Sequence, residues 1–410
     1  MNPVLWKLSV TLALTALVAP QWTLKQKLEP PYDGSRAFYG SVLVADGTTL
    51  AVADVFAGPW GSSGPAGAVY LYRRQGSWVL DARIDNPSTS PQGPSFGWSA
   101  ALKGSLLAVG DPLTFPGRVH LFTRQRNGKW TFASTVTSPD PTWTRSFGDF
   151  LSTDGMTLAV HSRYWNGISG YPDRVYVFDV RDPAEPLLAT RLEPSPQRDS
   201  PFGECTAVSG DLLAVSDRLS DSTGFSGSGV VHLYRHTTAG WTLDSILSPN
   251  DPQSSAQFGC GLQLEGLRIA VGAPGYSTLR PAVGAVYVFD QDSSGAWQQS
   301  ARLTPADDTP LGWFGSPLSL SGNRLVAGAS LSNIAGFYSG AAYVFDRDRR
   351  TGAWSASQRL LPEPAFEGLR FGLATALTDD TVFVNAPYDH VGGRERGTVV
   401  VYRNRGANGS

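Results

Sequence analysis

The chain is poor in several residue types, and each scarcity excludes a class of protein. Only 17% of its 410 residues are charged and the formal net charge is −2. A near-neutral chain lacks the positive charge that neutralises phosphates, so we expect no nucleic-acid partner. The sequence also contains 12 Trp, 14 Tyr and 19 Phe. Many aromatic residues and a low net charge argue against intrinsic disorder.

Catalytic and metal-binding motifs are also missing. The sequence has no H-E-x-x-H, no G-x-S-x-G and no phosphate-binding loop. Its 5 histidines and 2 cysteines show no spacing typical of a metal site. We therefore expect no metal, no cofactor and no enzymatic activity.

Long apolar runs are absent apart from one at the N-terminus. Residues 8–19 (LSVTLALTALVA) follow Lys7 and are too few to span a bilayer, but they match the apolar region of a secretory signal. We expect residues 1–19 to be a signal peptide and the mature protein to be secreted or at the cell surface, without a membrane span. Pro20 is a poor context for cleavage after Ala19, and an apolar leader without a sorting role is the alternative.

What the chain has is a block of about 55 residues that recurs from residue 21 onward. Each copy has a Trp-led segment, a Pro/Asp/Ser loop, a Phe-Gly step, a Leu-Ala-Val-Gly-like run, a Gly-rich loop and a Val-Tyr-Val-Phe-like run. The Phe-Gly steps begin at Tyr39, Phe96, Phe147, Phe202, Phe258, Phe314 and Phe371. The leading Trp residues are Trp22, Trp78, Trp130, Trp241, Trp297 and Trp354, with Pro186 in the remaining slot. An apolar residue follows six positions later: Leu28, Ile84, Val136, Leu192, Leu247, Leu303 and Leu360.

Each copy contains four short strand-like runs; in the fifth copy they span 258–264, 267–271, 285–289 and 297–303. A polar-Gly pair such as Glu265-Gly266 separates the first two runs, which is a hairpin signal. Four-stranded antiparallel units repeated radially form a β-propeller. We therefore predict an all-β, seven-bladed propeller over residues 20–410 as one domain. The strand at 22–28 should complete the last blade as its outermost strand and so close the ring.

The repeat resembles a known family. Phe258-Gly259, the stretch Val271-Gly272-Ala273-Pro274 and the run 284–289 (GAVYVF) are similar to the FG-GAP repeat. That repeat forms the seven-bladed propeller of integrin α chains and occurs in bacterial secreted proteins. The resemblance implies the same fold and a role in binding. It does not extend to the calcium loops of integrin-type repeats, because a two-residue turn such as Glu265-Gly266 cannot supply six to eight oxygen ligands.

The long loops should lie on one face of the propeller, because the loop leading into the first strand and the loop joining the second to the third strand emerge on the same side of a blade. These loops are rich in aromatic residues, which favours a recognition surface. The alternative is that each ring packs onto its own loop or plugs the central channel. The candidate aromatic ligand-binding residues are Trp60, Tyr164, Trp165 and Tyr388.

Charged residues occupy unusual positions at the ends of the second strands. Asp54, Asp111 and Asp217 replace the Ala of Gly-Ala-Pro in three copies, and Arg163 and Arg218 follow in two copies. These side chains are candidates for holding a polar ligand. The alternative is that each Asp turns its loop by accepting hydrogen bonds from nearby backbone N–H groups.

Cys205 and Cys260 are the third and second residues after a Phe in neighbouring copies. This one-residue offset directs them to opposite faces of their strands, so we expect two free thiols, with a disulfide as the alternative.

Together these observations predict a monomeric, non-catalytic extracellular binding or adhesion protein that recognises a glycan or a protein through its long-loop face. One alternative is an extracellular polysaccharide hydrolase that uses Asp54, Asp111 or Asp217. The other is a purely structural surface module.

Overall fold

The computed structural model describes residues 21–31, 38–57, 67–88, 95–142, 144–164, 173–194, 201–307 and 309–404. The expected signal peptide at residues 1–19 lies outside these ranges. The described residues form seven four-stranded sheets, and every strand pairs antiparallel with its neighbours. Among them no helix has the length and apolar character to cross a membrane.

We number the sheets as blades in chain order. Blade 1 comprises β2 (Val42–Asp46), β3 (Thr49–Asp54), β4 (Ala68–Gln75) and β5 (Ser77–Asp85). Blade 2 comprises β6 (Ala100–Lys103), β7 (Leu106–Asp111), β8 (Arg118–Arg124) and β9 (Trp130–Thr137). Blade 3 comprises β10 (Thr144–Thr153), β11 (Thr157–Tyr164), β12 (Arg174–Asp179) and β13 (Leu187–Leu192). Blade 4 comprises β14 (Phe202–Ser209), β15 (Leu212–Asp217), β16 (Val230–Thr237) and β17 (Gly240–Leu247).

Blade 5 comprises β18 (Gly261–Glu265), β19 (Arg268–Ala273), β20 (Ala285–Gln291) and β21 (Trp297–Leu303). Blade 6 comprises β22 (Leu318–Ser321), β23 (Arg324–Ala329), β24 (Ala341–Arg347) and β25 (Trp354–Leu360). Blade 7 comprises β26 (Thr375–Leu377), β27 (Thr381–Ala386), β30 (Thr398–Asn404) and β1 (Trp22–Leu28). A two-stranded hairpin, β28 (His390–Val391) and β29 (Arg394–Glu395), extends the loop between β27 and β30.

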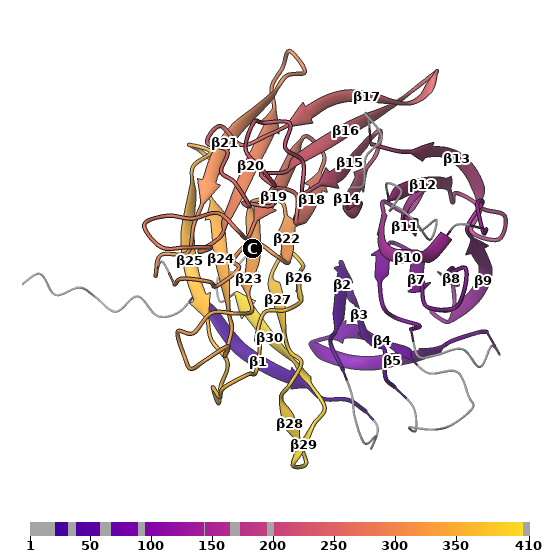
Figure 1. The fold of residues 1–410 in the computed structure, drawn as a ribbon. Helices are drawn as coiled ribbons and strands as arrows, with labels where there is room; N and C mark the ends of the chain where they lie inside the picture. Colours follow the sequence, from indigo (N-terminus) through magenta and orange to yellow (C-terminus); the bar gives the residue numbers. More distant parts are fainter. Residues whose placement is uncertain are drawn as a thin grey trace, which may run out of the picture.

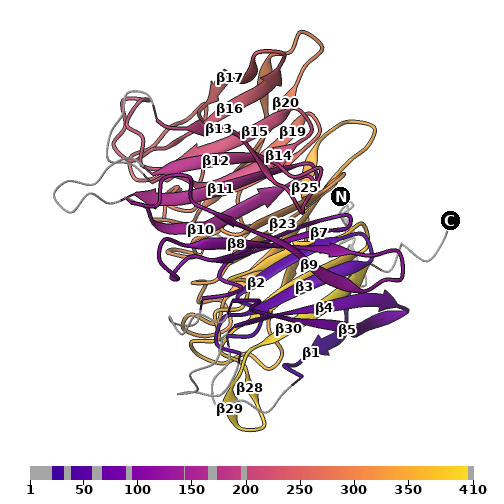
Figure 2. The same cartoon turned by 90° about the vertical axis from the view of Figure 1, so that its right-hand side faces the viewer.

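The blades form a closed ring with the first strand of each at the centre (Figure 1). First strands contact one another in succession, β2 with β6, β6 with β10, and onward to β26, which contacts β2. Figure 2 shows the ring from the side, with the strands running between its two faces. The predicted seven-bladed propeller is therefore confirmed.

The N-terminal strand closes the ring as the sequence predicts. β1 pairs antiparallel with β30, so that Trp22 lies opposite Asn404 and Leu28 lies opposite Val399. The Trp22 backbone is also tied to blade 6, because its N–H donates to Gln358 Oε1 (2.8 Å) and its carbonyl accepts from Gln358 Nε2 (2.9 Å). The last blade is thus built from both ends of the chain.

The repeated apolar positions form the core. All seven aromatic rings of the Phe-Gly steps are completely buried, and so are the seven apolar residues that follow six positions after the Trp slot. The Trp residues differ among themselves. Trp22 and Trp78 are buried, whereas the other four are half-buried on outermost strands. All six lie on outermost strands, and the groups that cover them differ: Trp78 packs against Phe383 (4.9 Å), whereas Trp354 is covered by the Arg268 guanidinium of blade 5 (5.8 Å).

A second repeated glycine explains how adjacent blades join. The residue before the third strand of one blade lies against the Phe-Gly step of the next, as at Gly284 and Phe314, which form a parallel bridge. A Cβ at Gly284 would overlap the Phe314 carbonyl oxygen. The equivalent glycines are Gly67, Gly117, Gly229, Gly340 and Gly397. The Phe-Gly step therefore belongs to the seam between blades, and in blade 5 the first strand begins at Gly261 and not at the expected residue 258.

Candidate functional site

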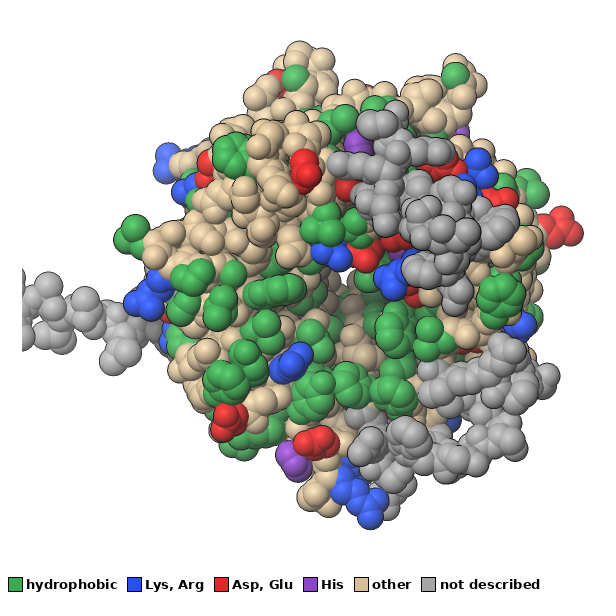
Figure 3. All heavy atoms as spheres, viewed as in Figure 1, with side chains coloured by type: hydrophobic (Ala, Val, Ile, Leu, Met, Phe, Trp, Pro, Cys, Tyr) green, Lys and Arg blue, Asp and Glu red, His purple; other side chains and the backbone are tan. Residues whose placement is uncertain are grey.

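The two faces of the ring differ in what they carry. One face, the long-loop face, holds the loops that lead into the first strands and the loops that join the second to the third strands. The other, the turn face, holds the short turns, such as Glu265-Gly266 between β18 and β19. Figure 3 shows a hollow at the centre of the ring, with basic and acidic side chains beside it on one side and mostly apolar side chains on the other.

The residue after each Phe-Gly step forms a rim around the centre of the long-loop face. These seven rim residues are Ser41, Trp98, Asp149, Glu204, Cys260, Ser316 and Leu373. Adjacent rim positions are close in space, because Arg163 reaches both Asp149 and Glu204. Of the seven side chains only Asp149 is buried. The repeat therefore places side chains of differing chemistry at equivalent positions around the hollow.

A charged cluster occupies the rim of blades 3 to 5. Arg163 Nη2 lies 3.7 Å from Asp149 Oδ2 and 3.5 Å from Glu204 Oε1. Arg218 Nε lies 2.5 Å from Glu204 Oε2, and its Nη1 donates to Gln257 Oε1 (3.1 Å). We call Asp149, Arg163, Glu204, Arg218 and Gln257 the charged cluster. Since Arg163 is 51% exposed, a ligand in the hollow has access to at least one guanidinium group of the cluster.

The Asp149 carboxyl is held in an unfavourable environment. Burial raises its pKa, and the negative charges of Asp173 and Glu204 act in the same direction, while His161 and Arg163 oppose them. The net pKa of Asp149 is higher than usual. A carboxyl whose pKa is raised in a hollow is a feature found at functional sites.

The two cysteines lie beside this cluster, Cys205 next to Glu204 in the chain and Cys260 in the rim. Both thiols are free, as expected, and Cys205 Sγ lies 2.9 Å from the Cys260 carbonyl oxygen. Burial raises the pKa of both thiols. Because the thiolate is the reactive form, these cysteines are poor nucleophiles.

An aromatic row crosses the long-loop face over blades 6, 7 and 1. Phe337 and Tyr338 stack with ring centroids 4.0 Å apart, and the Arg370 guanidinium lies 6.0 Å from the Tyr338 ring and 5.9 Å from the Tyr388 ring. Tyr388 contacts Phe38 (5.3 Å), and Phe38 contacts Phe56 (5.7 Å). We call Phe337, Tyr338, Arg370, Tyr388, Phe38 and Phe56 the aromatic row. Phe337 is 53% exposed at its end.

Backbone strain is concentrated beside this site. The residue before the Phe-Gly step has positive φ in three successive blades, at Gln257 (57°), Trp313 (55°) and Arg370 (52°), and Tyr338 is at 50°. Bulky residues rarely adopt this left-handed conformation, and where they do the surrounding structure must enforce it. Here it is enforced by hydrogen bonds such as Arg370 N–H to the Tyr338 carbonyl (3.0 Å). The result is that Gln257 joins the charged cluster and Arg370 joins the aromatic row.

The three predicted aspartates end β3, β7 and β15 and are completely buried. Asp54 Oδ1 accepts hydrogen bonds from the backbone N–H groups of Phe38 (3.2 Å) and Phe56 (3.0 Å). This is the loop-turning arrangement, and it fixes two rings of the aromatic row. Asp54 therefore positions the site from beneath.

Asp111 is enclosed in the same way. Its carboxylate accepts hydrogen bonds from Ser95 and from Asn86 Nδ2 (3.2 Å) and lies 3.9 Å from His120 Nε2. Burial alone would raise its pKa, but these hydrogen bonds outweigh burial and hold the pKa below its usual range.

Three of the other predicted side chains, those of Arg163, Arg218 and Tyr388, lie in the described structure. Arg163 and Arg218 meet in the charged cluster through Glu204, and Tyr388 lies in the aromatic row. Trp60, Trp165 and the Tyr164 side chain lie outside the described structure. The residues that sequence reasoning missed are Phe38, Asp149, Glu204, Gln257 and Arg370. All flank a Phe-Gly step, so the signal that identifies them is the variation among the seven copies at the positions directly before and after that step.

Comparisons with known proteins support the repeat assignment. The FG-GAP repeat family matches residues 241–289 and 297–345, which run from β17 to β20 and from β21 to β24. The resemblance stated from the sequence is thereby confirmed, and the matched stretches have the same phase as the repeat. No curated protein sequence matches the chain.

Solved structures with a similar fold are distant in sequence. The periplasmic gluconolactonase PpgL of Pseudomonas aeruginosa is 17% identical, with 78% of this chain and 85% of that chain covered at a TM-score of 0.48. Sqt1 of Saccharomyces cerevisiae is 10% identical, with 92% of this chain and 99% of that chain covered at a TM-score of 0.49. Both likenesses are too remote to bear on the chemistry of this site.

Proposed function

We propose that this propeller, which carries FG-GAP repeats, is a non-catalytic extracellular binding or adhesion protein that recognises a glycan or another protein through its long-loop face. The aromatic row supports this proposal more than any other feature. It spans three blades, it is open at Phe337, and an arginine lies between two of its rings. Rigid aromatic and arginine side chains are the groups that dominate recognition surfaces.

The closed ring also favours binding. The aromatic row is fixed by backbone hydrogen bonds, from the N–H groups of Phe38 and Phe56 to Asp54 and from that of Arg370 to Tyr338. A surface that is already ordered loses little conformational entropy when a ligand binds. We further propose that residues 1–19 direct export, that the protein acts as a monomer, and that Trp60, Tyr164 and Trp165 extend the same surface.

The experiment is a screen of the purified protein on glycan and protein arrays, followed by affinity measurements on the best ligand. Phe337→Ala and Tyr388→Ala should each weaken binding by tenfold or more, a loss of about 1.4 kcal/mol, while the melting temperature stays close to that of the wild type. Phe132→Ala is the matched control, because Phe132 is equally exposed (50%) on the outermost strand β9. Equal affinity of all three variants would refute the proposal. A stable self-assembly without any array ligand would favour the structural alternative instead.

Hydrolysis of an extracellular polysaccharide is the second candidate. One observation favours it: Arg163 lies between two rim carboxylates, and one of them, Asp149, has a raised pKa, as a general acid requires. Asp149→Asn and Glu204→Gln should then abolish release of reducing sugar from a polysaccharide substrate. If the wild-type protein releases none from any polysaccharide that it binds, this candidate is excluded.

A further inference from the structure

A groove on the turn face lies between blades 1 and 2. Its volume is about 510 Å³, and it is lined by Arg73 of β4, the turn Gly104-Ser105, and residues 124–128 at the turn from β8 to β9. A second hollow of about 270 Å³ shares Arg73, Asn127 and Gly128 with it and adds Asp81, Lys129 and Trp130. We call the two together the basic groove. It lies on the face opposite the aromatic row and is independent of the function proposed above.

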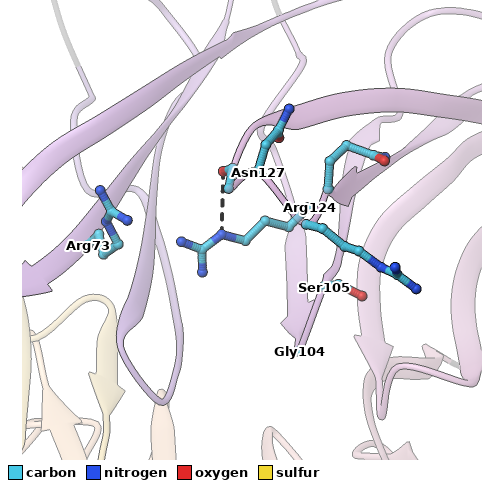
Figure 4. A pocket seen from close by; sticks show the side chains of 8 residues that line it. Arg73, Gly104, Ser105, Arg124 and Asn127 are labelled. Carbon is cyan, nitrogen blue, oxygen red and sulfur yellow. Dashed lines mark hydrogen bonds between the residues drawn. The ribbon is translucent and has the colours of Figure 1, made fainter.

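The basic groove has more positive than negative charge. Arg73 is paired with Asp81 (3.2 Å), and nearby Lys103 is paired with Asp46 (2.8 Å). Within the described structure, Arg124, Arg126 and Lys129 form no ion pair. Arg124 is held only by a long hydrogen bond from Nε to the Gly128 carbonyl oxygen (3.5 Å). Figure 4 shows its guanidinium group extending across the opening toward Arg73.

The other blades show which partner an arginine at this position can have. In blades 2, 4 and 7, a backbone N–H at the end of the third strand donates to the carbonyl of the residue directly before the second strand. The three pairs are Arg124 to Ser105 (2.8 Å), His236 to Asp211 (2.7 Å) and Asn404 to Asp380 (3.0 Å). These hydrogen bonds identify Ser105, Asp211 and Asp380 as equivalent positions.

The equivalent aspartates neutralise arginines in their own blades. Asp211 pairs with Arg235 in blade 4 (2.9 Å), and Asp380 pairs with Arg403 in blade 7 (3.2 Å) and with Arg74 of blade 1 (2.6 Å). Arg74 is the blade 1 equivalent of Arg124, because its N–H donates to the Thr48 carbonyl in the same way (3.0 Å). Arg235 and Arg403 lie one residue before the position of Arg124, so Arg74 is the arginine to compare, and its partner Asp380 belongs to the preceding blade. The residue equivalent to Asp380 in the blade before Arg124 is Thr48. Arg124 thus has a threonine of the preceding blade where Arg74 has an acid. Its positive charge is therefore left for a group from outside the chain.

We propose that the basic groove binds a tetrahedral oxyanion, a phosphate or sulfate group that is free or carried as an ester on a polymer. Arg73 approaches from β4, Arg124 from the end of β8, and Arg126 and Lys129 from the turn that follows. Cations from several directions suit an anion with oxygens on all sides better than a planar carboxylate. Arginine is the side chain that recognises such anions with paired hydrogen bonds. Because the groove is open to solvent, binding weakens as salt concentration rises.

Inorganic tripolyphosphate and dextran sulfate test this proposal, the first as a free oxyanion and the second as a polymer-borne ester, with uncharged dextran as the blank. Affinity is measured by calorimetry at low and physiological salt. Binding of tripolyphosphate alone would identify a free anion as the ligand, and binding of dextran sulfate alone would identify a polymer. Absence of saturable binding to both would overturn the proposal.

The sharpest variant is Thr48→Asp, which gives Arg124 the acid that Asp380 provides for Arg74. It should pair with Arg124, leave the melting temperature unchanged or higher, and weaken binding at least tenfold. Arg124→Gln should weaken binding similarly. Arg235→Gln is the matched control, because it removes a turn-face arginine that is already paired with Asp211 and Asp244. If Thr48→Asp and Arg124→Gln bind as tightly as Arg235→Gln, the groove is not the site.

Discussion

At the scale of single residues, the seven copies provide internal comparisons that no single blade offers. The position before the Phe-Gly step is Phe38 in blade 1, Gln257 in blade 5 and Arg370 in blade 7. The same backbone slot therefore places an aromatic ring, an amide or a guanidinium group beside the central hollow. Asp54 shows a supporting role at this scale, because its buried carboxylate holds the N–H groups of Phe38 and Phe56.

Asp149 gives a prediction with a definite sign. Burial raises its pKa in the folded protein above an unfolded value of about 3.9. Such a group favours folding while it is protonated and loses that contribution as the pH rises through the folded pKa. The Asn side chain in Asp149→Asn does not titrate. The melting temperature of this variant minus that of the wild type should therefore increase between about pH 4 and pH 7.

Asp111→Asn serves as the comparison of opposite sign. The Asp111 pKa is lowered, so its contribution to stability is present above the unfolded pKa and is lost as the pH falls through the folded one. The melting temperature of Asp111→Asn relative to the wild type should therefore fall as the pH rises toward the unfolded pKa of about 3.9 and change little at higher pH. Parallel pH profiles of the two variants would contradict both assignments.

At the scale of strands and turns, the glycine before six of the seven third strands holds neighbouring blades in register. Gly284 and Phe314 are in contact across the seam between blades 5 and 6. The hairpin glycines Gly266 and Gly322 make no such contact, because a Cβ at either position would meet no other atom.

Two glycines of the same blade test the seam. Gly284 and Gly295 have similar positive φ values, 92° and 86°, but a Cβ at Gly284 would overlap Phe314 whereas one at Gly295 would meet nothing. Both Ala variants incur a backbone strain of about 1–3 kcal/mol. Gly284→Ala should be clearly less stable than Gly295→Ala in denaturant unfolding, because only it also forces the blades apart. Equal destabilisation would mean that the seam tolerates the extra atom.

The strands and the core could be predicted from the sequence because burial imposes the same residue types on every copy. Phe258 and Leu303 are apolar because they are buried within one blade and against its neighbour, and all their equivalents are buried too. The site could be predicted only in part. Arg163 pairs with Glu204 of the next blade, and Tyr388 meets Phe38 near the other end of the chain. Such contacts depend on how the blades are placed around the ring, which no single repeat encodes.

At the scale of the whole molecule, the ring is closed by the pairing of β1 with β30. β1 contributes the buried side chains Trp22 and Leu28 to blade 7, and without it β30 would be an open edge. Open edges pair with other chains and promote aggregation.

Truncation tests this closure. A protein that begins at residue 29 loses β1, while one that begins at residue 21 keeps it. The shorter protein should lose at least about 3 kcal/mol of stability, since each buried side chain contributes about 1.5–3 kcal/mol. It should also self-associate in analytical ultracentrifugation. If both proteins melt alike and stay monomeric, β1 is dispensable for the fold.

The pairing of β1 with β30 also determines how the ring responds to force. Trp22 lies opposite Asn404 at the turn face, so the two ends of the paired strands are side by side. Pulling these two ends apart breaks the hydrogen bonds of the pair one after another, which takes little force. Pulling on the N-terminal end against a ligand held on the long-loop face instead acts along β1 and loads all the hydrogen bonds together. The closing strand is therefore mechanically weak in the first direction and strong in the second, which is the direction of load on a propeller tethered by its N-terminal end.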